Sequence, residues 1–386
     1  MGIKDKYAIV GIGYTPQGRL PGRTALGFHL EACANAIADA GLKKNDIDGL
    51  ICYRVFPPAS NEALVTPYLL AQHLGIAPDY MYEDANCSRS HLQNAIGALD
   101  AGFCNYVLLS YGHNAASSDS MTRMLTEMSP DDAPFGHFGA LAGYALAARR
   151  AMHEFPTGPE TWKHIAVGQR KWANLNPRAT MFKRSMTFDD YDNAPPLVEP
   201  FRLFDACLTT DGGRAMIITS AERAHNLKNP PVYIMGIGQH NPSYDIKQAT
   251  HATGPTGAQK AGKRAFNMAG ISIADVDACE IYDCFTYTVE ITLQDYGFFK
   301  PGEGKEWLQD GTIEPGGRMP VNTSGGLLSE AYFMGLTPIS EAAMQLMGRC
   351  EERQLGPRTK TKSPEIILCS DNGAILQTHS AIILRR

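Results

Sequence analysis

The chain has 386 residues, of which 44% are hydrophobic and 19% are charged. These values are typical of a globular protein with two or three domains, and they exclude general disorder and collagen-like or low-complexity sequence. A formal net charge of -5 leaves no cationic excess to neutralise phosphates, so we do not expect nucleic acid as a partner.

No run of about 18 apolar residues occurs, so we expect no membrane span, and residues 1–10 lack the features of a signal peptide. The nine cysteines are scattered, and none forms a Cys-x-x-Cys pair. The sequence therefore favours a cytoplasmic protein with mostly buried thiols, which has neither a disulfide framework nor a metal site of its own.

Two segments of the sequence resemble each other. Tyr-Ala-Ile-Val-Gly-Ile-Gly at 7–13 is matched by Val-Tyr-Ile-Met-Gly-Ile-Gly at 232–238, and both are typical of a strand. Each is followed by a predicted helix that ends at a glycine, Gly41 or Gly270, where a left-handed cap is expected. Further matched strands are predicted at 46–53 and 275–282, at 106–110 and 365–370, and at 214–219 and 375–383. Strands that alternate with helices in this way predict an α/β fold with two duplicated halves.

We assign residues 1–228 to the N-terminal half and residues 229–386 to the C-terminal half. The first half contains an insert, 115–200, that has no counterpart in the second and is predicted to hold a helix at 144–153. Long insertions often cover functional sites. The basic residues of the insert form either a solvated face or a cradle for a phosphate-bearing substrate; they are Arg149, Arg150, Arg170, Lys171, Arg178, Lys183 and Arg184.

Candidate site residues stand in turns between strands and helices, at 84–88, 282–285, 322–326 and 369–373. Ligands of such sheets bind where the carboxyl ends of strands meet the amino ends of helices. Cys87 is placed to be a nucleophile, because a helix amino end lowers the pKa of a thiol. Packing in the core is the alternative for Cys87, and equally for Tyr282, Cys284 and Tyr332.

The motifs in these turns resemble those of the thiolase superfamily, and most closely its sterol-carrier-protein type thiolases and lipid-transfer-protein aldolases. Asn86-Cys87-Ser88 is similar to the turn that carries the family nucleophile. Tyr282-Asp-Cys284-Phe resembles a His-Asp-Cys-Phe motif, and Asn322-Thr-Ser-Gly-Gly326 with Ala331-Tyr332-Phe resembles Asn-x-Ser-Gly-Gly followed by Gly-His-Pro.

Both family histidines are tyrosines here, as in the aldolase branch, whereas Cys284 is a thiolase feature. The large subunit of benzoylsuccinyl-CoA thiolase is a similar hybrid. The resemblance covers essentially the whole chain and implies a layered α-β-α-β-α fold.

The resemblance implies thiolase chemistry as the first interpretation. Cys87 would attack a β-ketoacyl-CoA, Cys284 would act as acid and base, and free coenzyme A would be the co-substrate. Backbone N–H groups of Cys87 and Gly373 and the hydroxyls of Tyr282 and Tyr332 would stabilise oxyanions. Asn322 and Gly326 complete the predicted oxyanion and substrate-binding set.

Two other functions remain open at this point. One is a retro-aldolase that cleaves a β-hydroxyacyl-CoA with Tyr282 and Tyr332 as base and acid. The other is a non-catalytic acyl-CoA carrier on the same scaffold.

The resemblance also implies two kinds of protein partner. One is a second copy of the chain, paired through an edge strand of the first-half sheet that we expect near residues 106–110. The other is a small zinc-ribbon/OB-fold protein, since the chain carries no zinc-ligand spacing itself.

Overall fold

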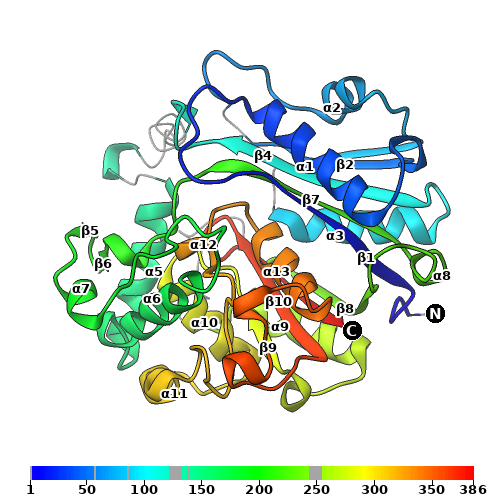
Figure 1. The fold of residues 1–386 in the computed structure, drawn as a ribbon. Helices are drawn as coiled ribbons and strands as arrows, with labels where there is room; N and C mark the ends of the chain where they lie inside the picture. Colours follow the sequence, from blue (N-terminus) through cyan, green and yellow to red (C-terminus); the bar gives the residue numbers. More distant parts are fainter. Residues whose placement is uncertain (1, 56–57, 85–86, 121–132, 137–138, 243–253) are drawn as a thin grey trace.

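The computed structural model describes residues 2–55, 58–84, 87–120, 133–136, 139–242 and 254–386 (Figure 1). The side chains of Asp84, Ala133 and residues 87–90 lie outside this description as well.

Nine strands of the described residues form one mixed sheet in the order β3-β2-β4-β7-β1-β8-β11-β10-β9. The strands are β1 (Tyr7–Tyr14), β2 (Gly49–Tyr53), β3 (Tyr80–Asp84), β4 (Tyr106–Asn114), β7 (Asp211–Ser220), β8 (Val232–His240), β9 (Ala278–Glu280), β10 (Ile366–Gly373) and β11 (Thr378–Arg385). A separate hairpin pairs β5 (Pro196–Val198) with β6 (Phe201–Arg202).

The strand order repeats itself in mirror image about the junction of β1 and β8. In the first half β2 runs parallel to β4, and β4 and β1 flank β7 in antiparallel fashion. In the second half β9 runs parallel to β10, and β10 and β8 flank β11 in antiparallel fashion. The halves join through the pairs Ala8–Tyr233 and Ile9–Val232. The predicted α/β class with duplicated halves is thereby confirmed.

Helices form layers on and between the two parts of the sheet. They are α1 (Ala25–Ala40), α2 (Pro67–Leu74), α3 (Cys87–Asp100), α5 (Gly139–Glu154), α6 (Pro159–Ala173), α7 (Phe188–Asp192), α8 (Ala221–Ala224), α9 (Gly257–Ala269), α10 (Thr286–Tyr296), α11 (Gly304–Leu308), α12 (Gly326–Ser329) and α13 (Leu336–Leu346). Helix α1 covers β1, β4 and β7, and α9 covers β8 and β11. Helices α3 and α13 each contact strands of both halves, so they form the central layer.

The two predicted helix caps have the expected geometry. Gly41 ends α1 with φ 75° and Gly270 ends α9 with φ 67°, and the N–H of each bonds to a carbonyl of the preceding helical turn. Residues with a Cβ avoid this left-handed backbone, which is why glycine marks both ends.

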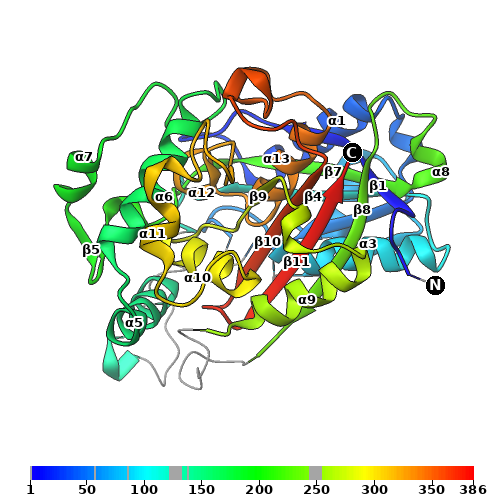
Figure 2. The ribbon, with the colours of Figure 1, turned by 90° about the horizontal axis from the view of Figure 1, so that it is seen from below.

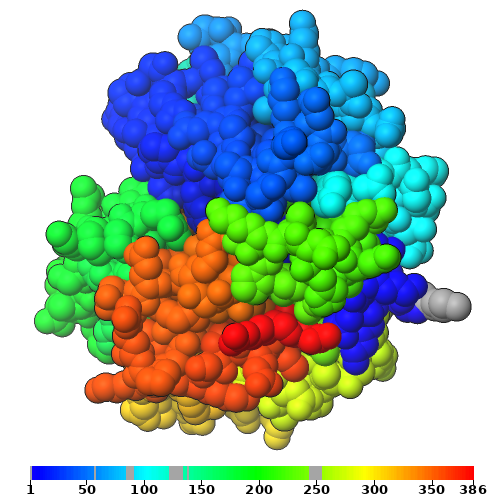
Figure 3. Space-filling view, turned by 45° about the vertical axis from the view of Figure 1, so that its right-hand side comes forward, coloured from blue at the N-terminus to red at the C-terminus, as the bar shows by residue number. Residues whose placement is uncertain are grey.

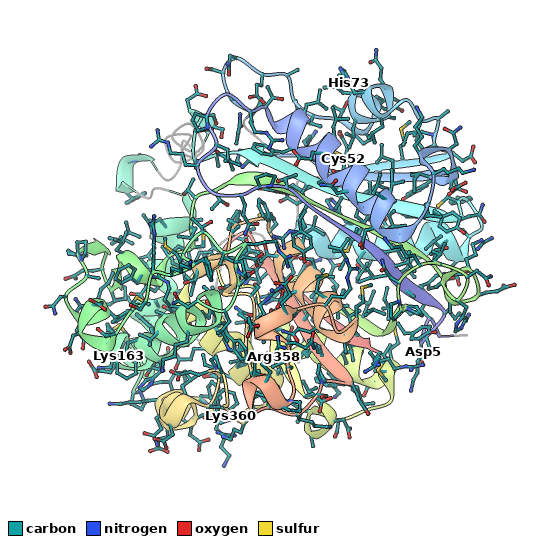
Figure 4. The ribbon with its side chains drawn as sticks, viewed as in Figure 1. Asp5, Cys52, His73, Lys163, Arg358 and Lys360 are labelled. Atoms are coloured by element: carbon teal, nitrogen blue, oxygen red, sulfur yellow. The ribbon has the colours of Figure 1, made fainter. Side chains whose placement is uncertain are left out.

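The insert packs beside the second half (Figures 1 and 2). Helices α5, α6 and α7 with the β5–β6 hairpin gather on one flank, where α6 contacts α10, α11 and α12. Tyr191 and Thr286 both donate to the buried carboxylate of Asp205, which ties the insert to α10. In Figure 4, Lys163 lies in this flank and Cys52 lies on β2 in the opposite half.

Basic residues of the insert partly serve internal contacts. Lys171 forms an ion pair with Glu314, and Arg170 donates to Ser329 while its guanidinium stacks over Phe204. These two side chains are therefore engaged in contacts within the protein.

The predicted dimer strand is not at an edge of the sheet. The segment 106–110 begins β4, which lies between β2 and β7, whereas β3 has a neighbour on one side only within the described residues. The sequence shows which segments are strands, but their order depends on long-range pairing, so the edge was misassigned.

Both termini lie on one side of the molecule (Figure 1), where Arg385 Nε bonds to Asp5 Oδ1 at 2.9 Å. On the face seen in Figure 3, the segment of α8 lies between the first half and the end of the second. No helix within the described parts of the chain is both long and apolar enough to cross a bilayer.

Candidate active site

Two tyrosine hydroxyls meet at the predicted site. Tyr282 follows β9 and Tyr332 follows α12, and their hydroxyl oxygens lie 2.8 Å apart. The edge of Tyr332 faces Tyr282, with ring centroids 6.4 Å apart and an interplanar angle of 71°. The structure therefore brings together two residues that the sequence placed in separate motifs.

Each tyrosine is fixed by its own backbone. The N–H of Tyr282 donates to Ser370 Oγ on β10 at 3.0 Å, and the N–H of Tyr332 donates to Thr210 Oγ1 next to β7 at 3.0 Å. Because β10 belongs to the second half and β7 to the first, the hydroxyl pair lies where the two halves meet.

Met334 contacts both hydroxyls. Its sulfur lies 2.7 Å from Tyr332 Oη and 3.7 Å from Tyr282 Oη, and its backbone is left-handed with φ 53°. The two hydroxyls have two protons; one makes the bond between the tyrosines and the other points at the thioether, which is a weak acceptor. A substrate oxygen in place of the sulfur would be a stronger acceptor of this proton.

Tyr332 stays protonated at neutral pH. Burial, with Cys207 and Tyr111 nearby, raises the pKa of Tyr332 well above its ordinary value, although the bond from Tyr282 partly offsets this. Tyr332 is therefore suited to donate a proton or a hydrogen bond rather than to stand as a tyrosinate.

Cys284 lies close to the tyrosines but in a poor environment for a thiolate. It is 7% exposed, and burial together with Cys207 raises the pKa of its thiol well above the ordinary range. Tyr144 of α5 forms a hydrogen bond with Cys284 and also donates to Asn372 Oδ1 at 2.6 Å. A cysteine in these surroundings is a neutral thiol, which weakens its predicted role as a base.

Asn322 and Gly326 hold the loop that carries Tyr332. Asn322 Oδ1 accepts from the N–H of Ile281 at 2.6 Å and its Nδ2 donates to the carbonyl of Ile281 at 2.9 Å. The N–H of Gly326 donates to Ser324 Oγ at 3.2 Å. These bonds brace the loop next to Tyr282, and contact of Asn322 and Gly326 with a substrate stays a prediction.

Asp283, between two predicted residues, was given no role from sequence. Its carboxylate accepts the N–H groups of Leu327 and Leu328 at 2.9 and 3.1 Å, at the start of α12. A Cβ on Gly326 would lie 2.2 Å from Asp283 Oδ2, and Gly326 has φ 61°, so only glycine fits. Burial raises the pKa of Asp283 to about 7.

A buried ion pair stands behind Tyr332. Arg214 of β7 donates to Glu330 at 3.0 Å, and both side chains are almost fully enclosed. The guanidinium lies between the rings of Tyr14 and Phe333, 4.3 and 4.8 Å from their centroids. Since Glu330 and Phe333 flank Tyr332, this cation fixes the loop from the first-half side.

For two other predicted site residues, Cys87 and Gly373, the structure gives the position of the backbone. Cys87 is the first residue of α3, but its side chain and Asn86 lie outside the described residues. Gly373 ends β10 and accepts the N–H of Gln377 through its carbonyl at 3.2 Å. Within the described residues no group of three or more His, Cys, Asp or Glu side chains is arranged to hold a metal ion.

Sequence reasoning missed Tyr144, Asn372, Met334 and Asp283. Tyr144 and Asn372 are 228 positions apart, and no local pattern links them. Met334 and Asp283 lie within or beside the recognised motifs, so their position was the available signal.

Comparison with known proteins links the whole chain to one group. Residues 238–386 match the family model "Thiolase C-terminal domain-like". The chain is 33% identical over 360 residues to a steroid side-chain-cleaving aldolase of Thermomonospora curvata, which covers 88% of this chain and 90% of that protein. It is 32% identical over 364 residues to the 17-hydroxy-3-oxo-4-pregnene-20-carboxyl-CoA lyase of Mycobacterium tuberculosis, with 90% and 92% covered. Among solved structures, the Ltp2-ChsH2(DUF35) aldolase has a TM-score of 0.87 at 30% identity and covers 100% of this chain and 99% of that chain.

Proposed function

This chain belongs to the thiolase superfamily, in its sterol-carrier-protein type branch, and we propose that it is a retro-aldolase that cleaves a β-hydroxyacyl-CoA. The observation that carries the proposal is the contact between the hydroxyls of Tyr282 and Tyr332. The two relatives described above are named as an aldolase and a lyase, which supports carbon–carbon cleavage over acyl transfer. The lyase is named for a hydroxylated CoA ester, which supports the substrate class.

The proposed reaction moves one proton and breaks one carbon–carbon bond. The β-hydroxyl loses its proton to one tyrosine, its oxygen forms a carbonyl, and the electron pair of the Cα–Cβ bond passes to the thioester as an enolate. The second tyrosine delivers its own proton to Cα. It regains a proton from the first tyrosine across the bond between the two hydroxyls, and the first tyrosine keeps the proton of the β-hydroxyl. No net proton is consumed, so a pair of neutral phenols 2.8 Å apart suffices and no stable tyrosinate is required.

The thiols support this choice. A thiolase requires Cys284 to exchange a proton near neutral pH, yet burial keeps the pKa of this thiol high. The retro-aldol route gives Cys284 no proton to carry. Thiolase chemistry remains the second candidate because Cys87 begins α3, where the helix dipole favours a thiolate.

The proposal includes an assembly and a location. As its name says, the solved aldolase has a DUF35 component, and we propose a partner of that type in the role expected for a zinc-ribbon/OB-fold protein. We further propose a homodimer that pairs through β3, whose outer edge has no strand partner in the described residues. The eight described cysteines are free thiols, which supports a reducing compartment such as the cytoplasm.

One assay separates the two reactions. The chain, with and without its DUF35-type partner, is given a β-hydroxyacyl-CoA without free coenzyme A, and separately a β-ketoacyl-CoA with free coenzyme A. Release of a ketone or aldehyde and a shorter acyl-CoA in the first mixture supports the proposal. Turnover in the second mixture alone would make the protein a thiolase.

A further inference from the structure

The turn between β10 and β11 has an unusual backbone. Ala374, Ile375 and Leu376 have φ values of 51°, 56° and 63°, so three consecutive residues other than glycine are left-handed. This conformation is unfavourable for L-residues, and most of all for a β-branched residue such as Ile375. Such backbones persist where the surroundings fix them, and they cluster at functional sites.

Helix α5 of the insert holds this turn at two adjacent positions. A Cβ on Gly143 would lie 2.3 Å from Ile375 Cδ1, so the helix backbone packs directly against the Ile375 side chain. The next residue, Tyr144, donates from its hydroxyl to Asn372 Oδ1 at 2.6 Å. Tyr144 is 3% exposed and its ring lies 4.9 Å from that of Phe285, so its position is fixed.

Tyr144 also bonds to Cys284. This bond lowers the pKa of the thiol, so the sulfur is its acceptor, and the single hydroxyl proton of Tyr144 is shared between Asn372 Oδ1 and Cys284 Sγ. The thiol of Cys284 itself donates to Thr288 Oγ1 at 3.9 Å. One hydroxyl thus joins the insert, the end of β10 and the loop that carries Tyr282. No other contact described above links these three segments through one atom.

We propose that Tyr144 is a positioning residue that holds the left-handed turn 374–376 and Cys284 in register with the hydroxyl pair of Tyr282 and Tyr332. The turn follows Gly373, whose backbone is the expected oxyanion donor. Displacing the turn would therefore misplace the thioester oxygen relative to the tyrosines. This last step rests on the proposed retro-aldolase function.

The test compares two buried tyrosines of the insert. Tyr144→Phe removes the hydroxyl and keeps the ring, while Tyr191→Phe removes an equally short bond, to Asp205 at 2.7 Å. We expect Tyr144→Phe to lower kcat by roughly 10- to 100-fold with little change in KM, because reacting groups are misplaced rather than lost. We also expect faster hydrogen exchange of the amides of residues 373–377 in this variant. Tyr191→Phe should change neither quantity.

Coupling to Asn372 gives a second measurement. In an Asn372→Ala background, Tyr144→Phe should change kcat by less than about 2-fold, because the hydroxyl then has lost its acceptor. Wild-type kcat and unchanged exchange in Tyr144→Phe would overturn the inference, as would equal loss of activity in Tyr191→Phe. If the wild-type protein has no lyase activity, the proposed function fails, but hydrogen exchange still tests the positioning role of Tyr144. Faster exchange of residues 373–377 in Tyr144→Phe supports that role, and unchanged exchange refutes it.

Discussion

The hydroxyl oxygens of Tyr282 and Tyr332 lie 2.8 Å apart although the residues are 50 positions apart in the chain. Each occupies the place of a histidine in the motifs that the sequence resembles. An imidazole can hold an extra proton as a stable cation near neutral pH, whereas a phenol, with a pKa of about 10, stays neutral there. The pair therefore favours a reaction in which a proton is passed on rather than stored.

Replacing either tyrosine by phenylalanine should interrupt this transfer. We expect Tyr282→Phe and Tyr332→Phe each to lower kcat for the β-hydroxyacyl-CoA by about 100-fold or more, as for loss of a general acid or base. The kcat of the double variant should be no lower than that of the less active single variant, because the effects of residues that act as a unit do not add. Tyr191→Phe is the control, since its hydroxyl donates to Asp205 and not to either tyrosine of the pair. Near-wild-type kinetics in both single variants would exclude the tyrosine pair as the catalytic groups.

Cys87 separates the two candidate reactions. In the retro-aldol route no acyl-enzyme forms, so Cys87→Ala should retain cleavage of the β-hydroxyacyl-CoA within about 3-fold, whereas a thiolase would lose its nucleophile entirely. Intact-mass measurement after incubation of the wild-type protein with an acyl-CoA provides the second readout. A covalent acyl adduct on Cys87 that turns over with free coenzyme A would contradict the retro-aldolase proposal.

Asp283 should make stability depend on pH. Its pKa is raised from 3.8 to about 7 by burial, so the folded protein binds a proton that the unfolded chain has released. The stabilising contribution is complete below the unfolded pKa and is lost as the pH rises through about 7. Between pH 5 and pH 8 we expect wild type to lose about 2 to 3 kcal/mol of unfolding free energy relative to Asp283→Asn, by urea titration. A pH-independent difference for Asp283→Asn would refute the assignment.

The local part of the fold could be predicted from sequence. The repeated strands and the caps at Gly41 and Gly270 follow from short patterns, because periodicity and glycine act over one or two turns of chain. The order of strands could not be predicted, since pairing between segments far apart in the chain decides which strand lies at the edge.

The residues of the candidate site also divide into those that a local motif predicts and those that only long-range contacts reveal. Tyr282, Cys284 and Tyr332 were found because they stand in recognisable motifs. Tyr144 and Asn372 were not, since their hydrogen bond joins segments 228 positions apart and no motif contains both. Asn322 and Gly326 were also found from their motif, whereas the bonds by which they brace the loop follow from packing that no motif shows.

The buried pair of Arg214 and Glu330 should be sensitive to loss of one partner. Arg214→Met removes the cation between Tyr14 and Phe333 and leaves the Glu330 carboxylate buried without compensation. We expect a loss of about 3 to 5 kcal/mol in urea unfolding, and partial recovery in the double variant with Glu330→Gln. Arg23→Met, which breaks a half-exposed pair with Glu31, should cost at most about 1 kcal/mol. Equal losses in the two arginine variants would show that burial of the pair does not matter.

The edge strand β3 should carry a homodimer contact. An edge strand leaves backbone N–H and C=O groups without sheet partners, and pairing with a second copy about a twofold axis satisfies them. Phe103, which is 61% exposed, stacks on Tyr80 at this edge with ring centroids 6.4 Å apart. An aspartate there would place charge beside the paired strands without disturbing the core.

We therefore expect sedimentation of the wild-type protein at micromolar concentration to give the mass of two chains, and Phe103→Asp to weaken the dimer by at least about 10-fold. Leu203→Asp is the matched control, because Leu203 is also exposed, at 48%, but lies in the turn Leu203–Asp205 that follows the β5–β6 hairpin. A wild-type monomer would refute the dimer itself. A stable dimer in Phe103→Asp, or equal weakening in both variants, would show that the contact lies away from β3, and the open edge would then need another cover, such as the DUF35-type partner.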